Sequence, residues 1–179
     1  NRGVTQAYLR ETIARLRQAV PGIALRTSVI VGFPGETEAA LDNLLAFLRE
    51  IRFERLGAFR YSREENSASF NYPDQIPAPT VEARYERVMR AQQELARGVN
   101  AAWQGRTVEV LIDEADPNDP TVFVGRSAAD CPDVDNLVYV RSRRPLAPGE
   151  FVRARIRAVK GCQGKLSRKK TSPYLQYPR

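Results

Sequence analysis

Two polar side chains interrupt residues 23–31, whose sequence IALRTSVIV is otherwise apolar and predicts a buried parallel strand. Successive side chains of a strand point to opposite faces, so Arg26 and Ser28 share a face with Ile30 and Gly32. Burying an arginine and a serine in a sheet is unfavourable unless each has a partner. If this face lines a barrel interior, Arg26 could bind a carboxylate and Ser28 could hydrogen-bond a ligand. In the alternative, Arg26 pairs with an acid from outside this sequence.

A glycine-rich loop with the sequence GFPGET follows the strand at its carboxyl end, where α/β folds place their binding sites. It contains Gly32, Phe33 and Pro34, and its glycines would allow a ligand close to the backbone. A helix predicted to begin after Thr37 would supply N–H donors. The loop lacks the lysine and the spacing of a nucleotide P-loop, so a plain turn between strand and helix is the alternative.

A second strand is predicted at residues 55–61 (RLGAFRY), and Tyr61 and Ser62 end it on the same rim as the glycine-rich loop. Their position suits contact with a ligand. It suits packing against a neighbouring helix equally well.

The chain of 179 residues has no histidine and only two cysteines, Cys131 and Cys162. It therefore cannot supply a Ser-His-Asp triad, a histidine general base or a histidine metal ligand. Two cysteines are too few for a four-cysteine zinc or iron–sulfur site. We expect no metal ligands and no proton-transfer residue in this chain, and we interpret the cysteines as structural residues or free thiols.

Helices and strands alternate around these residues, which indicates a parallel α/β fold. The predicted elements are a helix at 5–19 that is capped by Thr5 and has one apolar face, a strand at 23–31, a helix capped by Thr37 and a strand at 55–61. Two strands cannot close a barrel, so we expect that the N-terminal part of the fold lies outside this sequence. A polar segment, 62–79, and a helix capped by Thr80 and ending near Trp103 would connect this part to the next.

From Gly105 the apolar period changes to two, as in β-strands that are half buried. Short strands are predicted at 106–113, 121–126, 137–141 and 150–159, and together they suggest a small OB-like β-barrel. The expected domains are therefore 1–103, a barrel at 104–163 and a basic tail at 164–179. The tail shows no periodicity and is predicted to be disordered.

The formal net charge of +7 suggests a nucleic-acid partner at first, but its distribution does not. Residues 1–100 hold 14 basic and 12 acidic residues, residues 101–163 hold nine of each, and the tail holds five basic ones. Arg153, Arg155 and Arg157 form a stripe that could bind phosphates, although a solvated strand face explains it better. With no signal peptide and no apolar run of roughly 20 residues, we expect a cytoplasmic protein that does not enter membranes.

Two strings resemble a known family. RTSVIVGFPGETEAALDNLLAFL (26–48) and FERLGAFRYSREENSASF (53–70) resemble the C-terminal part of the radical-SAM barrel of methylthiotransferases. GRSAADCPDVDNLVYV (125–140) is similar to the TRAM domain of the same family, and its run from Asp130 to Asp135 resembles the RimO type, which modifies a ribosomal protein.

This resemblance implies an enzyme that uses S-adenosylmethionine and two 4Fe–4S clusters to install a methylthio group on the β-carbon of an aspartate in a small-subunit ribosomal protein. The cluster cysteines of the family lie upstream of the matched region, so this chain alone is expected to be inactive. Carried over residue by residue, the resemblance places seven residues at the S-adenosylmethionine pocket: Arg26, Ser28, Gly32, Phe33, Pro34, Tyr61 and Ser62.

The resemblance also implies a monomer whose TRAM domain contacts the ribosomal protein, with at most a weak RNA contact. Two alternatives remain open: a tRNA adenosine methylthiotransferase of the MiaB type, and a non-catalytic module that binds RNA or the ribosome. The tail departs from the family pattern, so no function is carried over to it.

Overall fold

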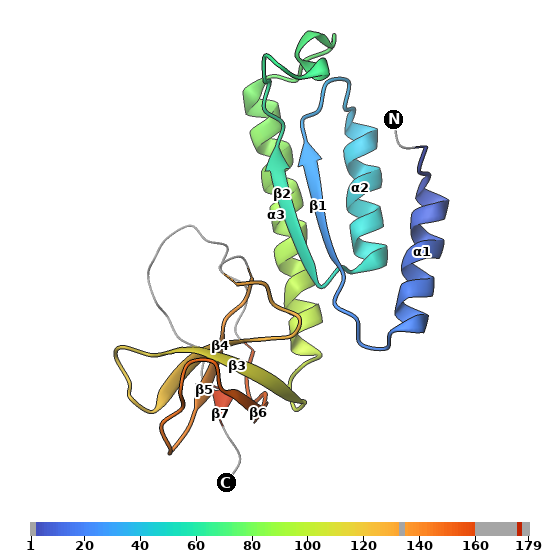
Figure 1. Ribbon diagram of the computed structural model, residues 1–179. Helices are drawn as coiled ribbons and strands as arrows, with labels where there is room; N and C mark the ends of the chain where they lie inside the picture. The colour runs from blue at the N-terminus through green and yellow to red at the C-terminus, as the bar shows by residue number, and fades with distance from the viewer. Residues whose placement is uncertain (1–2, 133–134, 160–174, 177–179) are drawn as a thin grey trace. The chain divides into compact units, whose positions relative to one another are not determined.

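The computed structural model describes residues 3–132, 135–159 and 175–176. Contacts within the chain divide it into two compact units, Asn1–Leu95 and Ala96–Arg179, which we call the first and the second unit and describe separately. The domain boundaries expected after residues 103 and 163 stay predictions. Figure 1 shows the helices and strands of both units.

The first unit is built around two parallel strands, as its alternating pattern predicted. Strands β1 (Arg26–Val31) and β2 (Arg55–Arg60) pair in a register that runs from Arg26 opposite Arg55 to Val31 opposite Arg60. The other elements are α1 (Gln6–Ala19), α2 (Glu38–Ile51), the short 3₁₀ helix η1 (Ala68–Asn71) and α3 (Ala78–Ala101). The parallel α/β character expected of residues 1–103 is therefore confirmed for the described part of this unit.

Two of the three predicted helix caps are confirmed. Thr5 and Thr37 each accept a hydrogen bond at Oγ1 from the backbone N–H three residues later, at 3.2 and 3.1 Å. The third prediction is wrong, because Thr80 lies inside α3. The carbonyl of Pro77 accepts hydrogen bonds from the N–H groups of Thr80 and Val81 at 2.9 and 3.0 Å, so the helix begins earlier.

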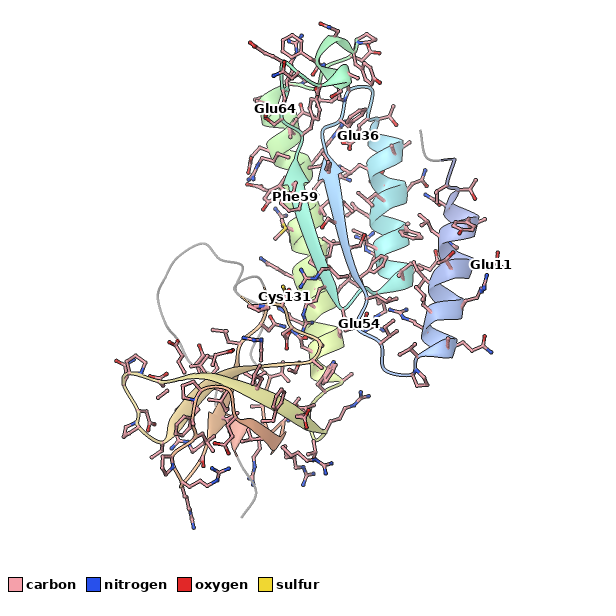
Figure 2. All side chains as sticks on the ribbon, viewed as in Figure 1. Glu11, Glu36, Glu54, Phe59, Glu64 and Cys131 are labelled. Atoms are coloured by element: carbon pink, nitrogen blue, oxygen red, sulfur yellow. The ribbon has the colours of Figure 1, made fainter. Side chains whose placement is uncertain are left out.

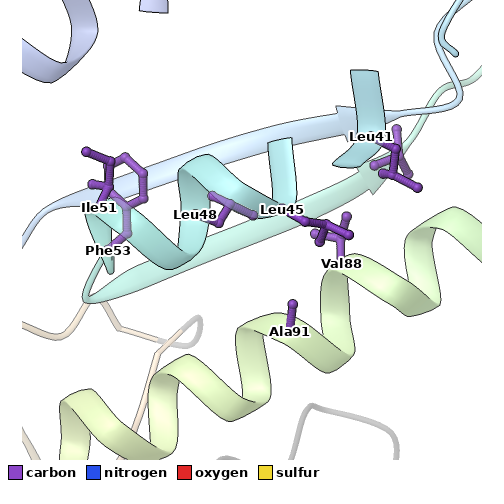
Figure 3. Packing of buried hydrophobic residues seen from close by; sticks show 8 residues of the cluster. Leu41, Leu45, Leu48, Ile51, Phe53, Val88 and Ala91 are labelled. Carbon is purple, nitrogen blue, oxygen red and sulfur yellow. The ribbon is translucent and has the colours of Figure 1, made fainter. Parts of the chain in front are cut away.

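The core of the first unit lies between the helices and one face of the sheet. Leucines at helical spacing on α2 pack against Val88 and Ala91 of α3 (Figure 3). Val29 and Val31 of β1 join this cluster from the sheet, together with Leu56 and Ala58 of β2. The buried residues of α2 are Leu41, Leu45, Leu48 and Ile51.

Helix α1 buries only part of its predicted apolar face: Ile13 packs against the core, and polar contacts attach the helix elsewhere. Leu9 and Leu16 are about two-fifths exposed, and no residue of α1 is fully buried. Arg10 instead donates to the carboxylate of Glu50 at 2.8 Å, and Arg17 donates to the carbonyl of Ile51 at 2.7 Å. Most of the predicted apolar face of this helix therefore remains exposed among the described residues.

The second unit contains a small closed β-barrel with the strand order β3-β4-β5-β7-β6. Its strands are β3 (Thr107–Ala115), β4 (Val122–Ser127), β5 (Val138–Arg141), β6 (Phe151–Arg155) and β7 (Leu175–Gln176). The first four correspond to the predicted strands, and their inward side chains, which include Val110, Ile112 and Val152, form its core. The predicted small all-β barrel is thus confirmed.

Strand β7 pairs parallel with β5 and antiparallel with β6, and the sequence pattern did not predict it. It falls in the segment 164–179, which was expected to be disordered. The other residues of that segment lie outside the described residues, so the expectation stays a prediction for them.

Candidate functional site

The sheet of the first unit has one face covered by helices and one exposed face. The exposed face carries Arg26, Ser28 and Ile30 on β1, and opposite them in register Arg55, Gly57 and Phe59 on β2. We call these six residues the open face. Ile30 and Phe59, which pair near the carboxyl ends of the two strands, are each 58% exposed, which is unusual for large apolar side chains within a sheet. Phe59 is labelled on β2 in Figure 2.

Gly57 keeps the middle of the open face free of side-chain bulk. A Cβ atom placed there would lie 3.5 Å from Ser28 Oγ and 3.4 Å from the ring of Phe59, which is ordinary contact. The hydroxyl of Ser28 and the ring of Phe59 therefore border a patch where backbone is accessible. This arrangement suits a flat ligand with at least one hydrogen-bonding group.

Arg26 lies at the amino end of β1, on the same face as Ser28. Gly32 lies six positions further along the chain, a length of about 20 Å in an extended strand. The structure therefore brings Arg26 to the open face but not to the rim at the carboxyl end of the strands.

Residues 32–37, the strand-end loop, are held tightly against α3. Gly32 has a φ of +79°, and a Cβ atom there would lie 2.5 Å from a methyl group of Val81, so only glycine fits. Its N–H donates to both carboxylate oxygens of Glu36 at 3.2 Å. The N–H of Gly32 is thus already bonded within the loop, and its conformation is fixed by packing and by this carboxylate.

An aromatic rim cluster forms where the loop meets the end of β2. The ring of Phe33 lies edge-on to Tyr61 and to Tyr72, with ring centroids 5.3 and 6.0 Å apart. The hydroxyl of Tyr61 donates toward Ser69, whose Oγ is 3.0 Å away. Phe33 and Tyr72 remain more than two-fifths exposed, so the cluster presents aromatic surface to a ligand.

The polar segment 62–79 folds back over this rim. Gly35 donates its N–H to the carbonyl of Asp74 at 3.0 Å, which ties the segment to the strand-end loop. Gln75 donates from Nε2 to the carbonyls of Ser69 and Tyr72 at 3.2 and 3.0 Å. Ser62 donates its hydroxyl to Glu64 at 2.6 Å. The polar segment 62–79 is therefore ordered by hydrogen bonds within itself and by its bond to the strand-end loop.

Ion pairs surround the rim on its helix side. Hydrogen bonds from Arg87 and then Arg84 hold the pKa of Glu38 below its ordinary value. Arg60 lies with its guanidinium carbon 3.6 Å from the ring centre of Tyr85, and it also donates to Glu82. That hydrogen bond lowers the pKa of Glu82 and raises that of Arg60.

The described residues hold no group of three or more cysteine, histidine or acidic side chains arranged to bind a metal ion. Cys131 is an exposed free thiol, whereas Cys162 lies outside the described ranges. Among the same residues no helix is long and apolar enough to cross a membrane.

Comparison with known proteins gives these features a context. The TRAM domain family matches residues 105–163, the region of the barrel. The ribosomal protein uS12 methylthiotransferase RimO of Opitutus terrae is 46% identical over 150 residues, which cover 84% of this chain and 30% of the relative. That of Desulforamulus reducens is 41% identical over 87% of this chain and 35% of the relative, and that of Anaeromyxobacter sp. (strain K) is 43% identical over 87% and 33%.

Over 84–87% of its length this chain is similar to methylthiotransferases of the RimO type, and its barrel region matches the TRAM domain family. It spans about a third of the length of the curated relatives it matches. The family resemblance of residues 26–70 and 125–140 is thereby confirmed.

In the TRAM domain, the glycine of the GRS string is required by close backbone packing. A Cβ atom on Gly125 of β4 would lie 2.3 Å from the carbonyl oxygen of Leu111 on β3. The two strands pair here next to a bulge between Ile112 and Glu114.

Beyond the strand, Ser127 donates its hydroxyl to Asp130 at 2.5 Å, and Asp135 accepts the N–H of Cys131 at 2.7 Å. Both aspartates therefore stabilise the loop that follows β4.

The outward arginines of β6 lie on a solvated strand face. Val152 and Ala154 are buried while Arg153 and Arg155 are exposed, so the predicted alternation is confirmed. Arg153 pairs in register with Glu109, which partly offsets its charge. Beyond the end of β6 at Arg155, Ile156 is still buried and Ala158 is exposed.

Of the seven predicted site residues, the structure brings Phe33 and Tyr61 into contact and places Ser28 on the open face. Gly32 and Pro34 shape the loop that carries Phe33. Sequence reasoning missed three residues of this region: Phe59, Tyr72 and Arg84. Phe59 could have been predicted, because the side-chain alternation that was applied to residues 25–32 also places Gly57, Phe59 and Tyr61 on one side of the next strand.

Proposed function

We propose that this chain forms the C-terminal part of a methylthiotransferase that modifies an aspartate of ribosomal protein uS12. The observation that carries the proposal is the open face beside the aromatic rim cluster, in a chain 39–46% identical to uS12 methylthiotransferases. A sheet whose helices cover only one face is expected where the other face lines the interior of a barrel. We therefore place the binding site of the enzyme on that face.

The residues of the open face and the rim fit S-adenosylmethionine, which supplies the radical chemistry when it is bound. The exposed rings of Phe33 and Phe59 suit the adenine base, and the hydroxyl of Ser28 suits a polar group of the ligand. Tyr61 packs against the ring of Phe33 in an edge-to-face contact. Arg26 suits the ligand carboxylate only if the ligand extends along β1 toward the amino end of the strand. These residues bind and orient, and none of them transfers a proton.

The 4Fe–4S clusters do not fit the described residues, which offer a single cysteine at the surface. In our proposal both clusters are held by cysteines of the longer protein. The 179-residue chain alone is then inactive.

The TRAM domain is proposed to contact the ribosomal protein rather than an RNA backbone. Three arginines of the barrel form ion pairs: Arg141 with Asp119, Arg144 with Glu150, and Arg126 with Asp113. Binding of a phosphate by any of these arginines would require its ion pair to break. Phosphate binding depends on a positive excess, which residues 101–163 lack. A weak RNA contact is assigned to the exposed Arg153 and Arg155. We further propose a monomer in the cytoplasm.

The test gives the full-length protein that carries this segment the purified uS12 protein and tRNA in parallel, with S-adenosylmethionine and a sulfur source. We expect a methylthio mass shift on one aspartate of uS12 and none on tRNA. A shift on tRNA alone would refute the proposed substrate. Modification of neither substrate by an enzyme that still cleaves S-adenosylmethionine would refute the proposed transfer.

A further inference from the structure

A buried arginine connects α3 to the strand-end loop. The side chain of Arg84 is 7% exposed, which is rare for a guanidinium. It donates from Nη1 to a carboxylate oxygen of Glu36 at 2.8 Å and to the backbone carbonyl of the same residue at 2.9 Å. Arg84 therefore bonds both the side chain and the backbone of one loop residue, 48 positions earlier in the chain.

Glu36 connects Arg84 to the residues at the carboxyl end of β1 through hydrogen bonds. Its side chain is 13% exposed, and its carboxylate accepts the N–H of Gly32 as well as the bond from Arg84. The N–H of Glu36 in turn donates to the carbonyl of Phe33 at 2.9 Å. One arginine thus holds a carboxylate that spans the loop from Gly32 to Glu36, with Phe33 between them. Glu36 is labelled beyond the end of β1 in Figure 2.

The remainder of the guanidinium group is held rigidly. Nε and Nη2 of Arg84 donate to the same oxygen of Glu38 at 2.9 and 2.8 Å. Arg87 donates to the other oxygen of Glu38 at 2.6 Å and to Asp42 at 2.7 Å. A planar guanidinium with several fixed partners positions its neighbours more precisely than a lysine could.

We propose that Arg84 is a positioning residue that holds the strand-end loop in the geometry in which Phe33 contacts S-adenosylmethionine. This rests on the proposed function. Burial makes the Arg84–Glu36 pair sensitive to change, because removing one partner leaves the other charge buried without compensation. In this conformation of the loop, Phe33 contacts Tyr61 and Tyr72 at the rim.

The test compares Arg84→Lys with the wild type in the full-length protein, kept under anaerobic conditions. Lysine keeps the positive charge but lacks the planar arrangement of Nε, Nη1 and Nη2 donors with which Arg84 bonds Glu36 and Glu38. We expect hydrogen–deuterium exchange in peptides covering residues 30–37 to become about tenfold faster, and the Kd for S-adenosylmethionine to rise about tenfold. Arg87→Gln is the matched control, since Arg87 lies one turn further along α3 and bonds Glu38 and Asp42 of α2 rather than residues 32–37. It should leave both quantities within twofold of the wild type.

A second variant covers the case in which Arg84→Lys does not fold. The double change Arg84→Gln and Glu36→Gln removes both buried charges together, so cooperative unfolding should be retained while loop exchange and Kd still rise. The inference is overturned if loop exchange is unchanged in folded variants, or if exchange rises while the Kd stays within twofold. A wild-type protein that does not bind S-adenosylmethionine would instead refute the proposed function, and the exchange measurement alone would then decide whether Arg84 holds the loop.

Discussion

The sheets of the two units bury their apolar side chains in different ways. In the second unit the strands close on themselves, and the inward side chains form a core within the barrel. In the first unit two strands bury one face against α2 and α3 and leave Ile30 and Phe59 exposed on the other. A closed sheet is complete as a folding unit, whereas an open one presents surface for something else to cover. This contrast supports the proposal that the ligand binds to the first unit.

The largest expected effect separates the covered face from the open one. Leu48→Ala removes a buried side chain of α2 and should lower the free energy of unfolding by about 2–5 kcal/mol, because a cavity remains in the core. Phe59→Ala removes a larger side chain that is already mostly exposed, and it should cost clearly less. Chemical denaturation of the full-length protein measures both. Equal losses would mean that the open face is covered in the complete protein.

The next effect compares one glycine from each sheet. Gly125→Ala should destabilise the TRAM domain by roughly 1–3 kcal/mol, since its Cβ would meet the backbone of β3. Gly57→Ala should leave stability unchanged or slightly higher, because a strand tolerates alanine better than glycine and the position has space. Thermal unfolding monitored separately for the two units provides the measurement. A stable Gly125→Ala variant would show that β3 and β4 can move apart without loss.

A smaller effect on ligand binding compares the strand-end loop with the opposite end of β1. Phe33→Ala should weaken S-adenosylmethionine binding by about 0.5–1.5 kcal/mol through loss of an aromatic contact. Arg26→Ala should also weaken binding, but less, because Arg26 lies at the far end of the strand. Isothermal titration of the anaerobic full-length protein gives both dissociation constants. An unchanged value for Arg26→Ala would remove that residue from the site.

The smallest effect concerns pH and the ion pairs at the surface. Hydrogen bonds from Arg10, from Arg87 and Arg84, and from Arg60 lower the pKa of Glu50, Glu38 and Glu82, respectively, in the folded state. Each carboxylate then contributes stability that is present above its unfolded pKa and is lost as the pH falls through its folded pKa. Unfolding midpoints should therefore decline only below about pH 4.5. A variant that combines Glu38→Gln, Glu50→Gln and Glu82→Gln should show a shallower decline of the unfolding midpoint with falling pH. An unaltered pH profile would contradict the contribution of these three carboxylates to stability.

Local sequence patterns predicted the elements better than the contacts that position the site. Strand alternation placed Ser28 and Ile30 on one face, and the caps at Thr5 and Thr37 fixed two helix starts. Thr80 failed as a cap, because the carbonyl of Pro77 starts α3 earlier. The contact between Arg84 and Glu36 joins residues 48 positions apart, and no local periodicity encodes such a pairing. Local periodicity likewise does not predict that Gly32 packs against Val81.

The pairing of distant strands has a consequence for the order of folding. Register partners in the β1–β2 pair, such as Arg26 and Arg55, are 29 positions apart, and α2 forms the connection between them. In the β3–β6 pair, Thr107 and Arg155 are separated by 48 positions. Contacts between nearer residues form faster, because a shorter segment loses less entropy when its ends meet. The parallel pair should therefore assemble before the barrel closes, both during refolding and as the chain emerges from the ribosome.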